Sequence, residues 1–400
     1  MLHVISKDQA VACVRKQMQT QPARTTTIAL QNASGYILSQ DILSAEDIPA
    51  FDRSTVDGFA VCAADTFGAG ASLPCELEII GEIAMGDTPA FTLRRGQCAR
   101  ISTGGMLPTG ADAAVMVEHT DTQERLCLVF QGVSPGANVT RRGDDIGAGA
   151  CALKKGTRLG AAEIGVLAAL GVYEVPVFQK PVVAVISTGD ELVTGTPKDG
   201  QMRDVNSFLL CAALEKSGCE ARMIGAIKDQ KEQIRAALTE SLKTADMVLL
   251  SGGSSAGAKD MTVELLQELG EVCFHGIAIK PGKPTIFGTV QDKPVFGLPG
   301  HPLAAYFVFR LIVTQALRER LHLPEDRPKK TAKLSVNIPS NHGREEYLCV
   351  KLLPDGTAVP LHTKSGIISV LTQADGFLCI PRDAEGLQSG SMIDIYEVEA

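Results

Sequence analysis

"DMVLLSGGSSAGAKD", residues 246–260, joins an apolar run to a loop of glycine and serine that ends near a Lys-Asp pair. A short apolar run bounded by turn residues is typical of a buried strand, and the following "MTVELLQELG" has the spacing of an amphipathic helix. Strand, Gly-rich loop and helix form the repeating unit of an α/β sheet, whose ligands bind beyond the carboxyl ends of the strands. We therefore expect a ligand at this loop.

The same unit repeats through residues 179–326. Before the loop, "PVVAVIST" and "CEARMIGAI" read as strands, and each precedes a helical stretch, with Asn206 and Asp229 expected as the helix N-caps. After it, "CFHGIAIK", "PTIFGTV" and "PVFGLPG" read as strands, and a long apolar helix begins at Pro302. This alternation predicts a three-layer, doubly wound parallel sheet with helices on both faces.

The rest of the chain has a different texture, which predicts an α/β multidomain protein. Ser6 and Gln9 form a capping box that opens a first helix. Residues 1–44 with 144–178 are expected to form a small discontinuous first domain, in which a helix near 160–170 completes the core begun by the first helix. Short strands separated by turn residues predict a β-rich second domain at 45–143 and a β-barrel-like C-terminal domain at 327–400.

Composition excludes several classes of protein. The chain has 400 residues, a net charge of −8 and no Trp, which argues against a nucleic-acid partner. Its 11 Cys form no C-x-x-C pair, so reduced thiols in a cytosol are expected. We find no signal peptide at the N-terminus and no run of about 18 apolar residues, so we expect a cytoplasmic protein without a membrane segment.

Polar clusters follow the predicted strands at "STGDEL" (187–192), "SGGSSAG" (251–257), "KPGKP" (280–284) and "LPGHP" (298–302). Each alone is an ordinary turn, but together they suit a phosphorylated ligand, because loop N–H groups bind phosphate and lysines add charge. Carboxylates among them would repel an anion unless a divalent cation lies between. The carboxylates are Asp190, Glu191, Asp229 and Asp260. The inferred ligand is a phosphorylated small molecule with Mg²⁺.

Eight motifs in order resemble one known family. They are "STVDGFAV" (54–61), "RISTGGMLPTGADAAVMVE" (100–118), "GANVTRRGDD" (136–145), "STGDEL", "DVNS" (204–207), "SGGSSAG", "KPGKP" and "LPGHP". The chain resembles molybdopterin molybdotransferases, the MoeA and gephyrin E-domain family. The resemblance implies four domains and an elongated homodimer, with an active site between the α/β domain of one subunit and the second domain of the other.

The implied reaction inserts molybdate into the dithiolene of adenylylated molybdopterin. Mg²⁺-dependent cleavage of the AMP–pterin pyrophosphate would give molybdenum cofactor and AMP. Molybdopterin adenylyltransferase and the enzymes that accept the cofactor are the implied partners.

Site residues follow from the resemblance, position by position. The matches to catalytic positions are Asp57, Thr103, Glu191, Asp229, Asp260, Lys280 and Lys283, with Glu191, Asp229 and Asp260 as the metal ligands. The matches to substrate-binding positions are Ser187, Thr188, Gly189, Asp190, Asp204, Asn206, Ser251, Gly252, Gly253, Ser254, Ser255, Gly257, Pro299, Gly300, Pro302, Arg142, Asp145, Arg344 and Ser365. Asp57 and Thr103 are implied to face the site of the other subunit.

Two departures from the family leave alternatives open. His301 stands where most relatives have Asn, and Cys349 stands where a second basic residue is expected, so a tungstate-preferring paralogue is one alternative. A non-catalytic cofactor carrier and a gephyrin-like scaffold are the others. A scaffold has no need of Asp57, Glu191, Asp229 and Asp260, so their presence favours the enzyme.

Overall fold

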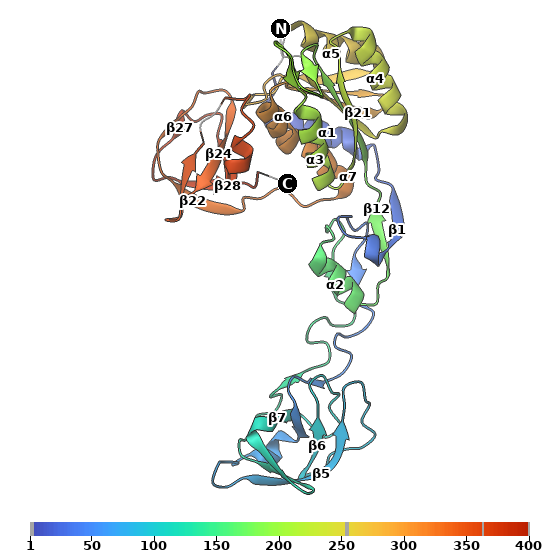
Figure 1. Ribbon diagram of the computed structural model, residues 1–400, viewed down its shortest axis with the longest axis vertical. Helices are drawn as coiled ribbons and strands as arrows, with labels where there is room; N and C mark the ends of the chain where they lie inside the picture. Colours follow the sequence, from blue (N-terminus) through green and yellow to red (C-terminus); the bar gives the residue numbers. More distant parts are fainter. Residues whose placement is uncertain (1–3, 253–255, 362–363, 399–400) are drawn as a thin grey trace.

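The computed structural model describes residues 4–252, 256–361 and 364–398, with the backbone alone at 256–260. The molecule is elongated (Figure 1): an α/β domain and a C-terminal β domain lie together at one end, and a second β domain lies at the other. A small middle segment that carries helix α2 (Ala161–Ala169) connects the two ends. Within the described ranges, no helix is both long and apolar enough to span a membrane.

The α/β domain is built on a six-stranded sheet with the strand order β16-β13-β17-β21-β20-β18. The bounds are β13 Val182–Thr188, β16 Glu220–Ile227, β17 Met247–Gly252, β18 Glu271–His275, β20 Ile286–Val290 and β21 Lys293–Leu298. Strands β16, β13, β17 and β21 run parallel, which confirms the predicted doubly wound fold. Strand β20 runs antiparallel to both of its neighbours.

The antiparallel strand has a local cause. Only Gln291 and Asp292 separate β20 from β21, and both adopt positive φ angles, 52° and 61°. Two such residues make the tight hairpin turn that joins antiparallel strands, whereas a parallel pair needs a crossover of about a dozen residues. The predicted parallel sheet therefore contains one antiparallel strand, β20, which the sequence pattern does not distinguish from the others.

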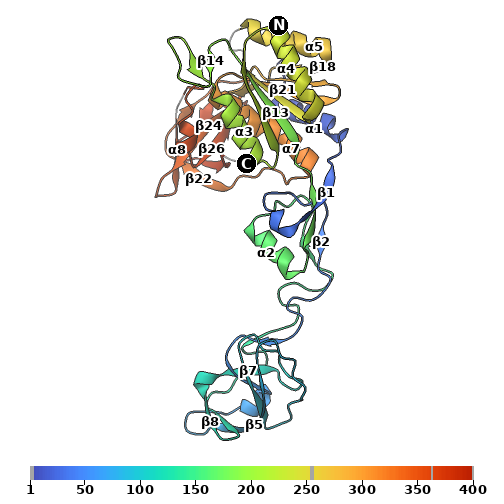
Figure 2. The same cartoon turned by 45° about the vertical axis from the view of Figure 1, so that its right-hand side comes forward.

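Helices cover both faces of this sheet (Figures 1 and 2). Alternate residues of β13 point to opposite faces, so Val183 and Val185 pack in one core while Ala184 and Ile186 pack in the other. The first core contains α3 Asn206–Lys216, α6 Pro302–Val308, a π-helical turn at Phe309–Val313 and α7 Thr314–Leu321. The second contains α4 Lys231–Thr244 and α5 Ala256–Leu269.

Helix α1 (Lys7–Gln19) begins as the sequence predicts, with the Ser6–Gln9 capping box fully formed. Its buried face, Ala10, Val14 and Met18, packs into the core of the α/β domain and against α7. The middle segment has a separate core of its own around Leu38 and Leu167. The expectation that the helix near 160–170 completes a core begun by the first helix is therefore wrong, while the domain borders at 44, 143, 178 and 326 remain predictions.

The middle segment consists of two strand pairs and α2. Strand β1 (Thr25–Ala29) pairs with β12 (Glu174–Phe178), and β2 (Ile42–Leu43) pairs with β11 (Cys151–Leu153), both antiparallel. Two strands of the chain thus run outward through this segment and two run back, so the far β domain is an insertion between them.

The far β domain has a six-stranded sheet with the order β7-β4-β6-β5-β9-β8. The bounds are β4 Gly58–Val61, β5 Cys75–Ile83, β6 Gln97–Ile101, β7 Ala113–Met116, β8 Thr120–Gln123 and β9 Leu126–Val129, with a separate pair β3 Arg53–Ser54 and β10 Val139–Thr140. Strands β5, β6, β7 and β9 coincide with the apolar runs "CELEII", "CARIS", "AAVMVE" and "LCLVF", which confirms the predicted β-rich fold here.

The C-terminal domain has a six-stranded sheet of order β19-β24-β25-β22-β28, with β26 paired to β24. The bounds are β19 Ile279–Lys280, β22 Lys330–Leu334, β24 Glu345–Leu352, β25 Thr357–Pro360, β26 Gly376–Ile380 and β28 Met392–Ile395. Strand β19 belongs by sequence to the α/β part, where "CFHGIAIK" is predicted as one strand. The structure instead ends β18 at His275 and pairs β19 with β24, so this segment joins the two domains.

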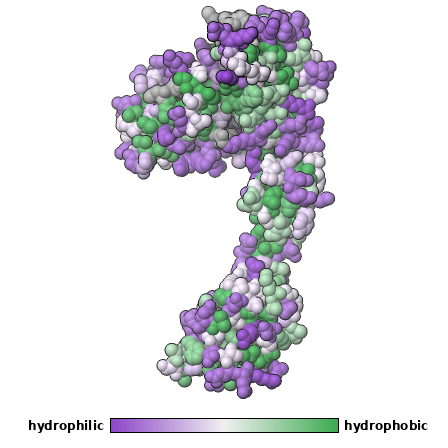
Figure 3. Space-filling view, in the orientation of Figure 1, coloured by the Kyte–Doolittle hydropathy of each residue, from purple (hydrophilic) through white to green (hydrophobic). Residues whose placement is uncertain are grey.

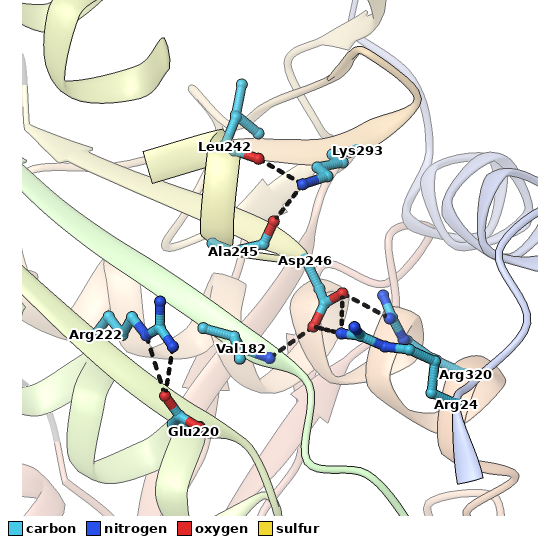
Figure 4. A network of polar contacts seen from close by, with 9 residues as sticks. All are labelled: Arg24, Val182, Glu220, Arg222, Leu242, Ala245, Asp246, Lys293 and Arg320. Atoms are coloured by element: carbon cyan, nitrogen blue, oxygen red, sulfur yellow. Dashed lines mark hydrogen bonds and ion pairs between the residues drawn. The ribbon is translucent and has the colours of Figure 1, made fainter. Parts of the chain in front are cut away.

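A network of ionic contacts fastens the middle segment to the base of the α/β sheet (Figure 4). The Asp246 carboxylate accepts hydrogen bonds from Arg24 Nη2 at 2.9 and 3.1 Å, from Arg320 Nη2 at 3.1 Å and from the Val182 amide at 2.9 Å. The Arg320 side chain is only 6% exposed, so its guanidinium depends on this carboxylate for its counter-charge.

We expect Asp246→Asn to lower the free energy of unfolding by about 2 kcal/mol, since the amide keeps the shape but loses charge-assisted hydrogen bonds. Urea unfolding followed by far-UV circular dichroism measures the change. Glu220→Gln is the matched control: Glu220 pairs with Arg222 at the surface, where an ion pair contributes at most about 1 kcal/mol. Equal losses in the two variants would contradict this account.

Candidate active site

Three parallel strands, β13, β17 and β21, end at the same edge of the sheet, where side-chain hydrogen bonds link residues at their ends to Asp204 and Asn206 at the start of α3. Asn206 Nδ2 donates to Ser251 Oγ at 2.8 Å and to the Gly300 carbonyl at 2.9 Å. Ser187 Oγ donates to Asp204 Oδ1 at 2.9 Å. The predicted cluster at the carboxyl ends of the strands is therefore assembled in the structure.

The backbones of β13 and β17 approach closely at this edge. A Cβ on Gly252 would lie 2.3 Å from both the carbonyl oxygen and Oγ1 of Thr188, and the φ of Gly252 is +155°. Only glycine fits there, which explains the first glycine of the loop. Gly253, Ser254 and Ser255 lie outside the described residues. Gly257 and Asp260 lie in α5, where only the backbone is described, so the roles of all five stay predictions.

Two buried acceptors at the edge have no hydrogen-bond donor in the described part of the chain. They are Asp204 Oδ2 and Asn206 Oδ1, and both side chains are buried. A buried polar atom without a partner costs free energy, so such atoms point to a ligand that supplies N–H groups or a cation.

Asn206 is not the N-cap that the sequence analysis expects. Val205 holds that position, and Asn206 is the first helical residue of α3, with its side chain turned toward the neighbouring strand ends. Pro302 likewise begins α6 as its first residue, a position that suits proline because no N–H is required.

Three carboxylates gather beside β13. Asp190 Oδ1 accepts a hydrogen bond from the Asp229 amide at 3.3 Å. Burial, and then the nearby charges of Glu191 and Asp190, raise the pKa of Asp229, although a hydrogen bond from the Thr188 side chain offsets part of this effect. Asp229 Oδ1 is buried without a donor. Asp229 is also not a helix cap, since Gln230 is the N-cap of α4.

These carboxylates lie close together, and one of their oxygens, Asp229 Oδ1, is buried without a hydrogen-bond donor. Such a group suits a hard divalent cation, whose positive charge would offset the repulsion between the carboxylates. Among the side chains that the structure describes, no group of three His, Cys, Asp or Glu is arranged to hold a metal ion. The third predicted ligand, Asp260, has no described side chain. Glu191, Asp229 and Asp260 therefore remain the predicted metal ligands. The crowded carboxylates of Glu191 and Asp229 support this prediction.

A pocket of about 890 Å³ opens between the α/β domain and the C-terminal domain. Its walls bring together six of the predicted site residues, Lys280, Lys283, Pro299, Gly300, Arg344 and Ser365. Lys280 Nζ forms an ion pair with Glu346 Oε1 at 2.7 Å, and β19 pairs with β24 at these two residues. The "KPGKP" turn is therefore held directly by the C-terminal sheet.

The backbone conformation and close packing at position 282 explain why this turn contains a glycine there. The φ of Gly282 is +119°, and a Cβ there would lie 2.6 Å from a methyl group of Val308. Glu346 is a further residue of this site, which is only 7% exposed and orients Lys280, and the sequence motifs do not indicate it. The signal that could have identified it is a carboxylate directly before the apolar run of β24, because buried charges are rarely left without a partner.

The two departures from the family both line this pocket. His301 makes no side-chain cap to α6, and its Nδ1 lies 2.9 Å from Ser365 Oγ, so the imidazole finds another partner. Cys349 is 3% exposed, and burial raises the pKa of its thiol to about 11. The thiol is therefore neutral at pH 7, and the pocket carries no charge at this position.

The remaining predicted residues lie in the far β domain or next to it, away from this edge (Figure 2). Asp57 Oδ1 accepts a hydrogen bond from the Thr103 amide at 2.7 Å, and Arg142 Nε donates to Asp47 at 2.6 Å. Asp145 is exposed beside them. Within one chain, Asp57, Thr103, Arg142 and Asp145 are thus not brought to the strand ends.

Comparison with known proteins identifies the family. The chain is 32% identical to molybdopterin molybdenumtransferase 2 of Mycobacterium tuberculosis over 397 residues, 94% of this chain and 95% of the relative. The chain belongs to the MoeA family. Family models match the MoeA N-terminal region (domain I and II) at residues 5–171, the "probable molybdopterin binding domain" at 184–319 and the MoeA C-terminal region (domain IV) at 331–398.

Other MoeA proteins agree over the full length. The molybdopterin molybdenumtransferase of Staphylococcus aureus is 32% identical, over 98% of this chain and 95% of that protein. Among solved structures, the molybdopterin biosynthesis MoeA protein of Pyrococcus horikoshii OT3 is 31% identical with a TM-score of 0.83, covering 98% of this chain and all of that one. The family resemblance and fold class inferred from the motifs are therefore confirmed.

Proposed function

We propose that this MoeA-family chain is a molybdopterin molybdenumtransferase. In this proposal it inserts molybdate into adenylylated molybdopterin, with Mg²⁺-dependent cleavage of the AMP–pterin pyrophosphate, and releases molybdenum cofactor and AMP. Full-length relatives that carry the name molybdopterin molybdenumtransferase support the transfer of molybdenum. One observation supports the finer reaction: carboxylates gather after β13 and β16, and basic side chains line the pocket that contains the residues after β21, so groups for a metal and for an oxyanion lie at the same end of the sheet.

In the basic pocket, Lys283 and Arg344 would hold the oxyanion by charge, and the Ser365 hydroxyl would donate a hydrogen bond to it. Lys280 keeps its charge and direction through Glu346. Cys349 contributes no charge there, so the pocket relies on its lysines and Arg344.

At the sheet edge, Asp204 Oδ2 and Asn206 Oδ1 would accept hydrogen bonds from N–H groups of the pterin nucleotide, which satisfies two buried oxygens. Glu191, Asp229 and Asp260 would hold Mg²⁺, which supplies charge neutralisation at the pyrophosphate. The Gly-rich loop that begins at Ser251 would bind the phosphates through its N–H groups, as its sequence predicts.

We further infer a cytoplasmic homodimer in which Asp57, Thr103, Arg142 and Asp145 of one copy complete the site of the other. Their separation from the strand ends within one chain supports this inference (Figure 1). The middle segment also leaves hydrophobic surface uncovered (Figure 3), with Leu43 60% and Tyr173 66% exposed, as expected of a surface that a second copy covers. Molybdopterin adenylyltransferase and cofactor-accepting enzymes stay the proposed partners.

The test is AMP release from adenylylated molybdopterin with Mg²⁺, measured with molybdate present and then absent. We expect release that molybdate stimulates and that chelation of Mg²⁺ abolishes. A Lys283→Gln variant should lose the stimulation, whereas Lys333→Gln, a change of an exposed lysine in β22, should keep it. Tight binding of the pterin nucleotide without AMP release would instead identify a carrier or scaffold, and stimulation by tungstate alone would identify the tungstate-preferring alternative.

A further inference from the structure

A second pocket, of about 540 Å³, lies where the middle segment meets the α/β domain. Lys154, Lys155 and Arg158 reach it from the segment that follows β11, and Arg318, His322 and Leu323 reach it from α7 and the residues just after it. It shares no lining residue with the 890 Å³ pocket. Both lie along one helical run, and Ala304 and Leu317, which line the first and second pocket, are about 20 Å apart along its axis.

This second pocket is strongly basic. Four cationic side chains line it, Lys154, Lys155, Arg158 and Arg318, and none of its described lining residues carries a carboxylate. Burial lowers the pKa of both Arg158 and Arg318, which means that each guanidinium is partly desolvated. The nearest counter-charge, Asp326, lies 3.7 Å from Arg318 and is shared with Arg310 at 2.6 Å.

Helix capping explains only part of this cluster. Arg158 Nη1 donates to the Lys216 carbonyl at 2.6 Å, at the end of α3, and Arg318 Nη1 donates to the Pro324 carbonyl at 2.6 Å. Such contacts are common where arginines meet the C-terminus of a helix. Arg318 Nε, however, is buried without an acceptor in the described structure, and the exposed Lys154 and Lys155 cap neither helix.

Direct contacts between the middle segment and the α/β domain hold the two walls of the pocket together. Gly156 has a φ of +84°, and a Cβ there would lie 2.0 Å from the His322 carbonyl oxygen, so the two segments are in direct backbone contact. The His322 ring stacks on the Phe178 ring with 5.6 Å between the ring centroids. Lys155 Nζ lies 5.6 Å from the centroid of the Phe178 ring. Leu317, Leu323 and Pro324 add an apolar surface beside the cations.

We propose that this pocket is a binding site for a small phosphate-bearing anion. Its charge would balance Arg158 and the two lysines and add to the shared carboxylate of Asp326 at Arg318, and the bound anion would bridge the middle segment and the α/β domain. Lys and Arg side chains around a cavity are the usual protein ligands of phosphate. This site lies apart from the proposed reaction site and does not depend on it.

Isothermal titration calorimetry of the full chain with inorganic pyrophosphate tests the proposal. The background variant is Lys283→Gln with Arg344→Gln, which removes two cations of the first pocket. In this background we expect one pyrophosphate per chain, and we expect Lys154→Gln with Lys155→Gln to weaken it at least tenfold. Both lysines are exposed, so the fold is not at risk. Arg158→Gln should weaken binding in the same direction.

The matched control is Lys333→Gln with Lys351→Gln, which removes the same charge from exposed positions in β22 and β24. It should leave the affinity within about twofold of the background, because exposed charges beyond a Debye length of about 8 Å are screened. Pyrophosphate binding that disappears in the background variant, or that survives the Lys154 and Lys155 changes as well as it survives the control, would overturn the proposal.

Discussion

Asp229→Asn is expected to lower the rate of Mg²⁺-dependent AMP release at least about 100-fold while the protein stays folded. The amide keeps the size of the side chain but removes a negative charge beside Glu191 and Asp190. Asp229 Oδ1 is buried without a donor, and the amide oxygen of Asn can still accept the hydrogen bond that the Thr188 side chain donates to Asp229. The measurement is kcat/KM for the adenylylated substrate at saturating Mg²⁺, compared with the unaltered chain.

The same substitution should not destabilise the metal-free protein. Burial raises the pKa of Asp229 above that of an unfolded chain, so ionising this group costs folding free energy at pH values above the raised pKa, and that cost disappears as the pH falls through it. Asp229→Asn removes the cost at pH 7 to 8, so its Tm should match or exceed that of the parent. The affinity of the parent for Mg²⁺ should fall as the pH is lowered through the raised pKa of the metal-free protein, because protonation removes the negative charge of Asp229.

Glu232→Gln is the matched control, since Glu232 lies three residues further on and its side chain is 82% exposed. It should change neither turnover nor Tm. Undiminished turnover of Asp229→Asn would remove Asp229 from the mechanism. A drop in Tm as large as that expected of Asp246→Asn would instead assign Asp229 a structural role.

Much of the fold follows from local signals that agree with one another. The capping box of Ser6 and Gln9 and the buried run of β13 each specify an element within about ten residues of sequence. The departures depend on contacts between distant parts of the chain. Ile279 and Lys280 form a strand only because Glu345 and Glu346 are there to pair with them, and no local pattern indicates that pairing.

The candidate site also has features that the sequence predicts and features that only the structure shows. Parallel strands bring their carboxyl ends to one edge, so the meeting of Ser187, Ser251 and Gly300 follows from the alternation of strands and helices. The sequence wrongly predicts Asn206 and Asp229 as helix caps, because a short polar residue before a helix has the same pattern whether it caps the helix or faces a ligand. Only the observed neighbours, Ser251 for one and Asp190 for the other, separate the two roles.

Mixed subunits of Asp57→Ala and Asp229→Asn are expected to recover about one quarter of the parental activity, although each variant alone is inactive. In the proposed homodimer, each site takes its acidic set from one copy and Asp57 from the other. Random pairing gives heterodimers in half of the molecules, and each heterodimer keeps one intact site of its two. Co-expression with two different affinity tags, followed by two-step purification, isolates the heterodimer, which should then have about half of the parental activity.

A second mixture provides the control. Asp229→Asn with Glu191→Gln places both changes beside the same sheet edge, so every site in every combination of subunits carries one of them. No pairing can restore activity in this mixture, whereas a general stabilising effect of mixing would appear in both. Recovery confined to the Asp57 and Asp229 mixture therefore requires residues from the two ends of the elongated chain to meet between copies. Equal silence in the two purified heterodimers would instead contradict the shared site, because it would mean that Asp57 and Asp229 act within the same chain. Full activity of Asp57→Ala by itself would leave Asp57 outside the site.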